Sequence, residues 1–319
     1  DRLLFSQSDK INWKLWEIRV DGTSLRQVSQ MPDDVDSFDA CYLPNGRIVF
    51  GSTASCHAIP CWHGRKRATN LYVMDESGSG VRQLCFDQDY DLHPCVLSNG
   101  QVLYHRWDHA GINHIYLRQL MTMNPDGTAQ RAVYGSNSWF PNSLYFPRPL
   151  PGSSDKLVCI LSGYHGVHRM GQLVLVDTSR GWFEESGLVL RISGRGDPIE
   201  PKIADNLVDD EWPQFLHPYP LSDKHVLVAC RPDAKSDWGI YLADTFDNLV
   251  PIRQEPGYAL LEPVPVMKRA RPPVPVDRVN LERTDGIVYL HSVYTGPGLA
   301  GVPQGTIKGL RVIAYDFGY

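Results

Sequence analysis

The sequence lacks three features that would each define a class of protein. No run of apolar residues approaches the roughly 20 that a membrane-spanning helix requires. Apolar stripes with the period of a helix are nearly absent, which argues against a helical fold. Basic residues do not predominate, because 31 Lys and Arg stand against 36 Asp and Glu and the formal net charge is −5. We therefore expect neither a membrane span nor a nucleic-acid partner.

The cysteines also lack the pattern of a covalent haem site. There are seven, so at least one thiol stays free, and none belongs to a CxxCH motif for attachment of c-type haem. Cys56 and Cys61 share the short connection CHAIPC. A local disulfide is the first interpretation of this pair, and metal binding with His57 or His63 is the second.

Glycine and proline, by contrast, are abundant, with 27 and 24 copies spread along the chain. One strand–turn–strand unit recurs as KLWEIRVDGTSLRQVS from Lys14, NLYVMDESGSGVRQLC from Asn70 and QLMTMNPDGTAQRAVY from Gln119. Alternating apolar residues around an Asp-Gly or Ser-Gly turn are typical of a β-hairpin. Repetition of such units at intervals of roughly 45–70 residues indicates the blades of a β-propeller, once loop insertions are allowed.

One strand of the blade can be found six times. The copies are RLLFSQ from Arg2, RIVFGST from Arg47, QVLYHRW from Gln101, KLVCILSG from Lys156, HVLVACR from His225 and GIVYLHSV from Gly286. We therefore predict an all-β fold, a six-bladed β-propeller of four-stranded antiparallel blades, with residues 1–319 as one domain. An inner strand is missing at the start and an outer strand at the end, so we expect incomplete closure of the terminal blade and a chain cut from a longer protein.

Nine of the eleven histidines fall in segments that strand polarity places on one face of this propeller. They are His57, His63, His93, His105, His109, His114, His165, His168 and His217. The long loops after second strands and the connections between blades meet at this face, and tight turns fill the other. Irregular loops on a rigid scaffold are common functional sites. Imidazole suits both proton transfer near neutral pH and the binding of transition metals.

Two groups of residues on this face are candidates for chemistry. The candidate ligands for a divalent transition metal are His93, His105, Asp108, His109 and His217. His93 and His217 begin matching inner strands, HPCVL and HPYPL, where a hydrogen bond to the neighbouring blade is an equally open interpretation.

The second group lies in the segment YHGVHR, residues 164–169. Tyr164, His165 and His168 are candidates for proton transfer, and Arg169 for holding a carboxylate. The alternative is a loop whose flanking glycines only allow the chain to bend.

Several long motifs resemble the propeller portion of the hydrazine synthase alpha subunit and its relatives. They include FDQDYDLHPCVLSNGQVLYHRWDHAGINH from Phe86, YGSNSWFPNS, SGYHGVHRMGQLVLVD and EPGYALLEPVPV, and together they cover most of the chain. The resemblance implies a TolB- or WD40-like six-bladed propeller in a periplasmic or secreted bacterial protein. It also implies a haem-bearing domain or subunit as partner, because downstream segments of that family carry c-type haem and pack against the propeller.

These observations leave two hypotheses of different kinds. One is a binding and docking module whose histidine-rich face packs on a cofactor domain, a metal or a partner. The other is an enzyme: a metal-dependent lyase or hydrolase acting on a sugar or small polar substrate, or a subunit of a multihaem oxidoreductase. Oligogalacturonate lyases, which resemble this kind of propeller with histidine-bound metal, make the lyase feasible. Imidazoles converging on one point would favour the enzyme, and separated imidazoles would favour docking.

Overall fold

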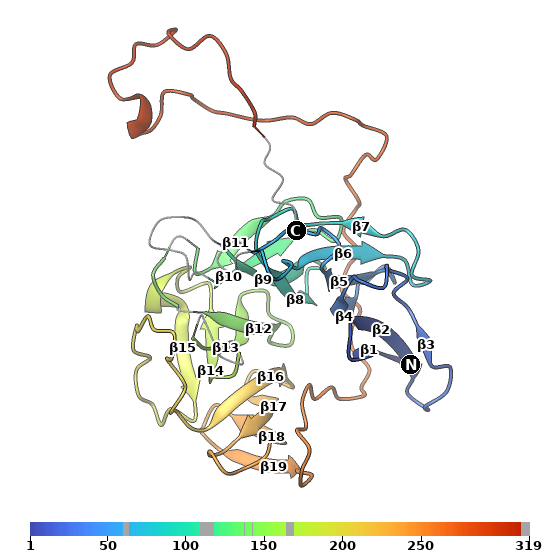
Figure 1. The fold of residues 1–319 in the computed structure, drawn as a ribbon. Coiled ribbons are helices and arrows are strands. Elements are labelled where there is room, and N and C mark those ends of the chain that lie inside the picture. Colours follow the sequence, from blue (N-terminus) through green and yellow to red (C-terminus); the bar gives the residue numbers. More distant parts are fainter. Residues whose placement is uncertain (60–63, 109–117, 137, 142, 164–168, 314–319) are drawn as a thin grey trace.

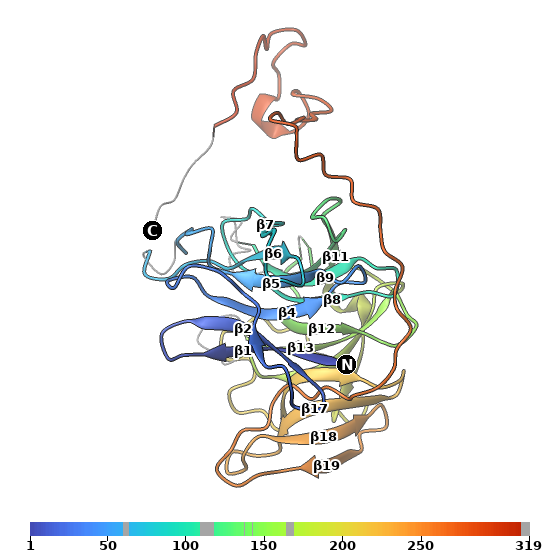
Figure 2. The same cartoon turned by 90° about the vertical axis from the view of Figure 1, so that its right-hand side faces the viewer.

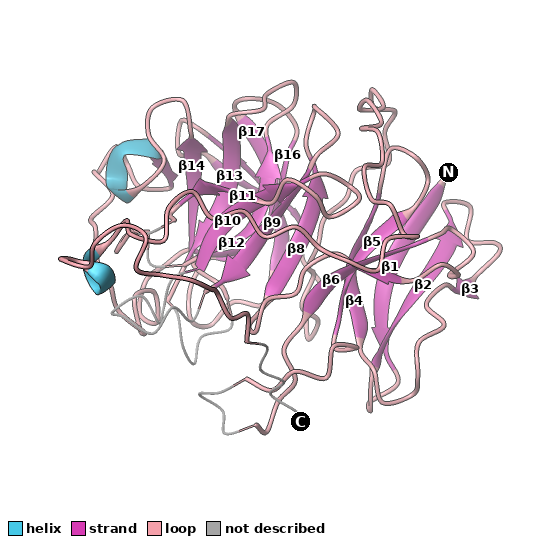
Figure 3. Ribbon diagram, turned by 90° about the horizontal axis from the view of Figure 1, so that it is seen from above, coloured by secondary structure: helices cyan, strands magenta, loops and turns pink. Residues whose placement is uncertain are grey.

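The regular secondary structure of the described chain is almost entirely antiparallel β-strand (Figure 3). The computed structural model describes residues 1–59, 64–108, 118–136, 138–141, 143–163 and 169–313. The described residues contain two short 3-10 turns, η2 (Glu184–Gly187) and η3 (Pro297–Leu299). None of the described helical segments has the length and hydropathy needed to cross a membrane.

The strands form five blades that follow one another along the chain around a central axis (Figure 1). The first blade has three strands, β1 (Arg2–Ser8), β2 (Trp13–Arg19) and β3 (Arg26–Gln27). The second has β4 (Ser37–Tyr42), β5 (Ile48–Ser52), β6 (Asn70–Met74) and β7 (Arg82–Gln83). The third has β8 (Asp91–Val96), β9 (Val102–Trp107), β10 (Arg118–Met123) and β11 (Arg131–Tyr134).

The fourth blade has β12 (Leu144–Pro149), β13 (Lys156–Leu161), β14 (Gln172–Asp177) and β15 (Leu188–Ile192). The fifth has β16 (Gln214–Pro220), β17 (His225–Arg231), β18 (Gly239–Asp244) and β19 (Leu249–Arg253). Within every blade the strands pair in chain order, which is the meander expected from the hairpin signals.

The hydrophobic core lies between neighbouring blades rather than in one central mass. Separate buried clusters join the first blade to the second, the second to the third, the third to the fourth and the fourth to the fifth. Strand β9 is buried along its whole length and β13 at every residue but the first, because both of their faces are covered. A near-continuous apolar sequence suits such a position.

The prediction of six blades is wrong. Five of the six predicted copies are strands, namely β1, β5, β9, β13 and β17, but residues 286–293 form no strand. Their apolar side chains are exposed, for example Ile287 at 80% and Tyr289 at 83%. Residues 309–313, at the end of the described chain, form no strand either.

The path of the chain after β19 explains this difference. Residues 263–278 form a proline-rich stretch, with five prolines. Such a stretch supplies few backbone N–H groups for pairing and favours extended, unpaired chain. This stretch crosses the turn face of the second and third blades, where the Arg278 backbone N–H donates to Asp126 Oδ2 at 2.6 Å and Arg47 pairs with Asp277 at 3.5 Å. Residues 279–313 therefore continue away from the blades (Figures 1 and 2).

Gly100 shows how closely this stretch approaches the turn face. It has a φ of +83°, and a Cβ atom there would lie 2.1 Å from the carbonyl oxygen of Pro273. Glycine is thus required at this turn both by the backbone conformation and by the contact.

We expect limited digestion with trypsin to cleave after Arg283, Lys308 or Arg311 before it cleaves after Arg106 or Lys156. The first three residues follow β19 in exposed chain without strand pairing, and the last two lie in paired strands. Mass spectrometry of the early fragments measures the order. Cleavage at Arg106 or Lys156 first would contradict the five-bladed arrangement.

Candidate functional site

The same irregularity occurs in the inner strand of four blades. The pairing register shifts between Phe38 and Cys41 in β4, and equivalent β-bulges interrupt β8, β12 and β16. In each bulge one residue that is not glycine adopts a positive φ: Asp39 at +53°, His93 at +56°, Phe146 at +50° and His217 at +49°. Residues with side chains rarely adopt this conformation, and a bulge re-aims the side chain that it carries. The bulge therefore determines which residue of each inner strand has its side chain re-aimed.

A fifth residue matches these four although it lies in no strand. Glu262 has a φ of +52° and precedes Pro263, as His93, Phe146 and His217 also precede prolines. The Leu260 backbone N–H donates to the carbonyl of Trp238, just before β18, at 2.9 Å. The Asp91 backbone N–H donates in the same way to Thr69, just before β6, at 2.8 Å. The segment around Glu262 therefore begins as the inner strands do.

These five residues follow one another around the central channel, and we call them the channel ring: Asp39, His93, Phe146, His217 and Glu262. Asp39 Oδ2 lies 2.9 Å from His93 Nδ1, and Glu262 Oε1 lies 3.8 Å from His217 Nε2. The Phe146 ring separates the two imidazoles, with centroid distances of 4.0 Å to His93 and 4.4 Å to His217. The ring thus holds two carboxylate–imidazole pairs, one on each side of a phenyl group.

The channel ring lines a hollow of about 290 Å³. Ser6 lies in the second half of β1, Trp13 begins β2, and Arg169 lies between β13 and β14, so the hollow reaches the face of the long loops. Its lining is mixed: aromatic Trp13, Phe38, Phe146 and Tyr219, acidic Asp39 and Glu262, and basic Arg148 and Arg169. Such a lining can hold a group with an apolar body and polar ends.

Burial keeps the channel imidazoles uncharged. His105, in β9, is 1% exposed, and its ring centroid lies 5.7 Å from that of His93. Among the described residues, neither ring nitrogen of His105 has a hydrogen-bond partner, and the same is true of Nε2 of His93 and Nδ1 of His217. Burial lowers the pKa of His105 well below its ordinary value and that of His217 to about 4. Burial also lowers the pKa of His93, although Asp39 opposes this shift.

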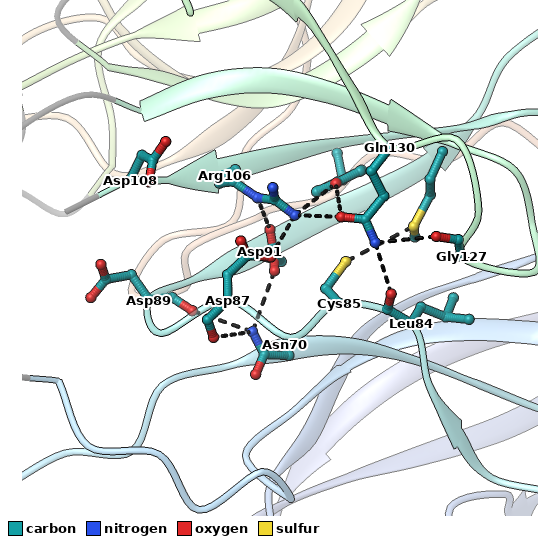
Figure 4. A network of polar contacts seen from close by, with 12 residues as sticks. Asn70, Leu84, Cys85, Asp87, Asp89, Asp91, Arg106, Asp108, Gly127 and Gln130 are labelled. Atoms are coloured by element: carbon teal, nitrogen blue, oxygen red, sulfur yellow. Dashed lines mark hydrogen bonds and ion pairs between the residues drawn. The ribbon is translucent and has the colours of Figure 1, made fainter. Parts of the chain in front are cut away.

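The structure brings together part of the predicted metal set. His93, His105 and His217 lie around the channel, in strands rather than in loops. Asp108 instead accepts a hydrogen bond from Gln119 Nε2 at 3.1 Å on the side of β9 that faces the second blade (Figure 4). Predicted residues that lie outside the described part of the chain are His109, Tyr164, His165, His168 and Cys61.

Two predicted residues beside those segments are described. Arg169 places its guanidinium 5.9 Å from the ring centre of Tyr90 and 5.8 Å from that of Tyr145, at the edge of the hollow. Cys56 is exposed. The disulfide between Cys56 and Cys61 stays a prediction.

A second polar cluster lies between the second and third blades (Figure 4). Ligand atoms of Cys85, Asp87 and Asp91 fall within 4.8 Å of one another, the one such group of three found in the described chain. Arg106 already neutralises the carboxylates, at 2.6 Å from Asp87 and 2.9 Å from Asp91. Burial raises the pKa of Asp91 to about 7, against the effect of Arg106. Because a guanidinium holds this cluster, we interpret it as a structural ion-pair network.

The sequence prediction missed Asp39, Phe146 and Glu262. A signal for two of them existed: FPRP and EPVP occupy the place that HPCV and HPYP occupy in other inner strands. Asp39 precedes Ala40 instead of proline, so only its register in the strand could have indicated it.

Comparisons with known proteins identify the architecture. No family model and no curated protein matches the chain. Kuenenia stuttgartiensis hydrazine synthase is structurally similar at a TM-score of 0.62 and 17% identity, over 83% of this chain and 39% of that chain. A putative TolB from Agrobacterium tumefaciens gives 0.41 and 16%, over 59% and 62% of the respective chains. An oligogalacturonate lyase in complex with manganese gives 0.41 and 14%, over 73% and 54%. At these identities the similarity shows a propeller fold and nothing finer.

The buried imidazoles should make stability depend on pH. The folded-state pKa values lie below the ordinary value near 6.5, so the unfolded chain takes up protons first as the pH falls. The contribution of these neutral histidines to the free energy of unfolding is complete above about pH 6.5. It is lost as the pH falls toward the pKa in the folded state, which is about 4 for His217. Each such histidine changes the free energy of unfolding by up to about 1.4 kcal/mol per pH unit in this window.

We expect His105→Phe to weaken this dependence, because it removes one buried titrating group and two unpartnered nitrogens. Between pH 7.5 and pH 5 the variant should lose about 1–2 kcal/mol less stability than the parent in urea titrations. His225→Gln, at an exposed histidine, is the control and should behave like the parent. Equal losses in His105→Phe and the parent would show that His105 is not buried in the neutral form.

The ion-pair network between the second and third blades gives a second prediction. Arg106→Met leaves the buried Asp91 without its guanidinium partner, so the free energy of unfolding should fall by about 3–5 kcal/mol. Adding Asp91→Asn should recover part of this loss, because the amide carries no charge. Denaturant titrations of the parent, of Arg106→Met and of the double variant measure the free energy of unfolding. A loss below about 1 kcal/mol in Arg106→Met would refute a structural role for the ion-pair network.

Proposed function

We propose that this chain is a propeller binding module that docks, through the channel ring and the hollow above it, on a partner domain or subunit. The observation that carries the proposal is the separation of the imidazoles. His93 and His217 lie on opposite sides of Phe146, and the only ligand-atom triad in the described chain excludes both of them. Separated polar groups around an open, partly aromatic hollow suit recognition of a surface group rather than one catalytic centre.

The strain at the channel ring supports a role in binding. Five non-glycine residues with positive φ at matched positions are unfavourable for the backbone, and such residues concentrate at functional sites. Aromatic side chains and arginine are also enriched where interfaces bind most strongly, and Trp13, Phe146 and Arg169 line this hollow.

The similarity to hydrazine synthase supports a proposal for the nature of the partner. The match covers 39% of that chain, so the similar propeller there is one part of a larger protein. We propose a haem-bearing domain or subunit in a periplasmic or secreted setting as the partner. Under this proposal the chain contributes shape and polar contacts, and the partner contributes the redox group.

A metal-dependent lyase or hydrolase acting on a sugar or small polar substrate is the second candidate. One observation favours it: ring nitrogens of His93, His105 and His217 are buried without partners in the part of the chain that the structure describes, and Asp39 and Glu262 lie beside two of these rings. Neutral imidazole and carboxylate are the ligands that divalent transition metals take in proteins. Buried unpartnered nitrogens are uncommon unless water or an ion completes them.

Docking predicts that changes at the hollow remove binding of the partner. The parent and Trp13→Ala are immobilised and exposed to an extracytoplasmic extract of the source cells. The parent should retain the partner, and Trp13→Ala should retain at least tenfold less of it. Trp182→Ala removes another exposed indole, which lies outside the hollow, and is the matched control. Quantitative mass spectrometry measures the retained proteins. Equal retention by Trp13→Ala and Trp182→Ala would reject the docking function.

Metal analysis separates the two candidates. For a docking module, protein purified without chelator should contain well below one equivalent of any transition metal, and the combined His93→Ala and His217→Ala variant should contain the same amount. About one equivalent in the parent that is lost in the variant would favour the metal-dependent enzyme.

A further inference from the structure

Four charged side chains line the channel hollow, two of each sign: Asp39, Glu262, Arg148 and Arg169. The imidazoles that line it are neutral because they are buried. The lining therefore carries no net charge, and its chemistry depends on which of the four charges already have partners. The volume of about 290 Å³ lies at the small end of ligand pockets, so the hollow suits one or two side chains.

Asp39 and Arg148 already have partners within the protein. His93 donates its backbone N–H to the Asp39 carboxylate, and its Nδ1 lies 2.9 Å from the same oxygen. Although burial opposes the shift, His93 and Arg148 hold the pKa of Asp39 below its ordinary value. Arg148 Nη1 donates to the carbonyl oxygen of Pro94 at 3.4 Å. These two charges therefore need no partner from outside.

Arg169 is the cation of the hollow that lacks an anion. Its guanidinium lies 5.9 Å from the ring centre of Tyr90 and 5.8 Å from that of Tyr145. In the described chain it forms no ion pair and no hydrogen bond. A guanidinium can donate two parallel hydrogen bonds to a carboxylate, so Arg169 can take a carboxylate from an incoming group.

Glu262 is the carboxylate of the hollow that lacks a cation. Its Oε1 lies 3.8 Å from Nε2 of His217, whose imidazole is neutral, and its side chain is 76% exposed. Arg269, farther along the proline-rich stretch, lies over the Tyr219 ring at 4.6 Å instead. Among the described residues, no Lys or Arg pairs with Glu262. This carboxylate can therefore take a cationic group.

The two unpaired charges contact different blades. Arg169 lies beside Tyr145 of the fourth blade, and Glu262 lies beside His217 of the fifth. Phe146, which follows Tyr145 in β12, contacts the His217 ring at 4.4 Å and offers an apolar surface between them. An apolar group alone would take both charges out of water without replacing their hydration. The complementary group therefore carries a cation and an anion on an apolar body.

We propose that the partner inserts a basic side chain into the channel hollow, with its cationic end against Glu262, and that a neighbouring acidic side chain of the partner pairs with Arg169. The proposal rests on the docking function and names the chemistry of the docked surface. The stem of the basic side chain lies against Phe146 and Trp13, as such stems often cover apolar surface. A cation close to aromatic rings also gains from the cation–π interaction.

The experiment titrates the protein with the peptide acetyl-Lys-Glu-amide. Nuclear magnetic resonance of protein with ¹⁵N-labelled tryptophan follows the indole N–H signal of Trp13, which lines the hollow. We expect a saturable shift of this signal and none for Trp182, which lies outside the hollow. Norleucine in place of lysine, or glutamine in place of glutamate, should each weaken binding about fivefold or more, because each removes one ion pair.

Two variants assign the two ends of the peptide. Glu262→Gln should weaken binding of acetyl-Lys-Glu-amide about fivefold and change binding of the norleucine peptide less than about twofold. Arg169→Gln should weaken binding of acetyl-Lys-Glu-amide equally and leave binding of the glutamine peptide unchanged. The matched controls are Glu185→Gln and Arg195→Gln, at exposed residues outside the hollow, and Arg195 shares the positive φ of Arg169. Thermal unfolding checks that each variant folds.

Three results would overturn the proposal. The first is no shift of the Trp13 signal. The second is equal binding of the lysine and norleucine peptides, or an equal effect of Glu262→Gln on both. The third is tighter binding of free lysine than of the peptide, which would indicate a site for a small zwitterion instead of a partner segment.

The retention experiment distinguishes this proposal from the docking function. If Trp13→Ala loses the partner but the combined Glu262→Gln and Arg169→Gln variant retains it, the partner docks without these two ion pairs, and only the charge pairing is rejected. If Trp13→Ala retains the partner as Trp182→Ala does, the docking function itself is rejected.

Discussion

The β-bulge that recurs in the inner strands is the constraint on which the site depends. It places one residue of each inner strand at positive φ and turns its side chain toward the central channel. Without the bulge, Asp39, His93, Phe146 and His217 would follow the ordinary alternation of a strand, and a shift of one residue would move each side chain to the other face. The hydrophobic clusters between the blades hold the strands in position, and the bulges determine which side chains face the channel.

Electrostatics follows from this geometry. The channel ring buries the imidazoles of His93 and His217 beside the Phe146 ring, and burial rather than a neighbouring charge dominates their pKa shifts. The carboxylates of the ring stand at its two ends, next to His93 and His217. The channel therefore holds neutral imidazoles, two of which lie beside the carboxylates of Asp39 and Glu262. The neutral imidazole nitrogens can accept hydrogen bonds from an incoming group without the prior breaking of a strong ion pair.

Much of the fold could be predicted because the signals were local. Hairpin turns and alternating apolar residues placed five of the six copies of the repeated strand correctly. Residues 286–293 have the same alternation, but the prolines before them and the contacts of Arg278 and Gly100 on the turn face direct the chain away from the ring. Local pattern could not show this, because the deciding contacts join residues more than 150 positions apart.

The site was only partly predictable for the same reason. The histidines and Arg169 were identified from residue type and from the polarity of the strands. Asp39 has no following proline to mark it and became apparent only from its contact with His93 in the next blade. Glu262 could have been recognised from EPVP, and its contact with His217 places it in the ring. The Cys85, Asp87 and Asp91 cluster carries metal-binding residue types, yet the position of Arg106 between its carboxylates favours a structural role.

The central claim is that the fold buries the imidazoles of the channel in the neutral form. Nuclear magnetic resonance of the protein with ¹⁵N-labelled histidine rings measures the titration of each imidazole directly. We expect His105 and His217 to remain neutral at pH 5.5, because burial lowers the pKa of both rings. Titration of these two imidazoles near pH 6.5, the ordinary value, would contradict the account.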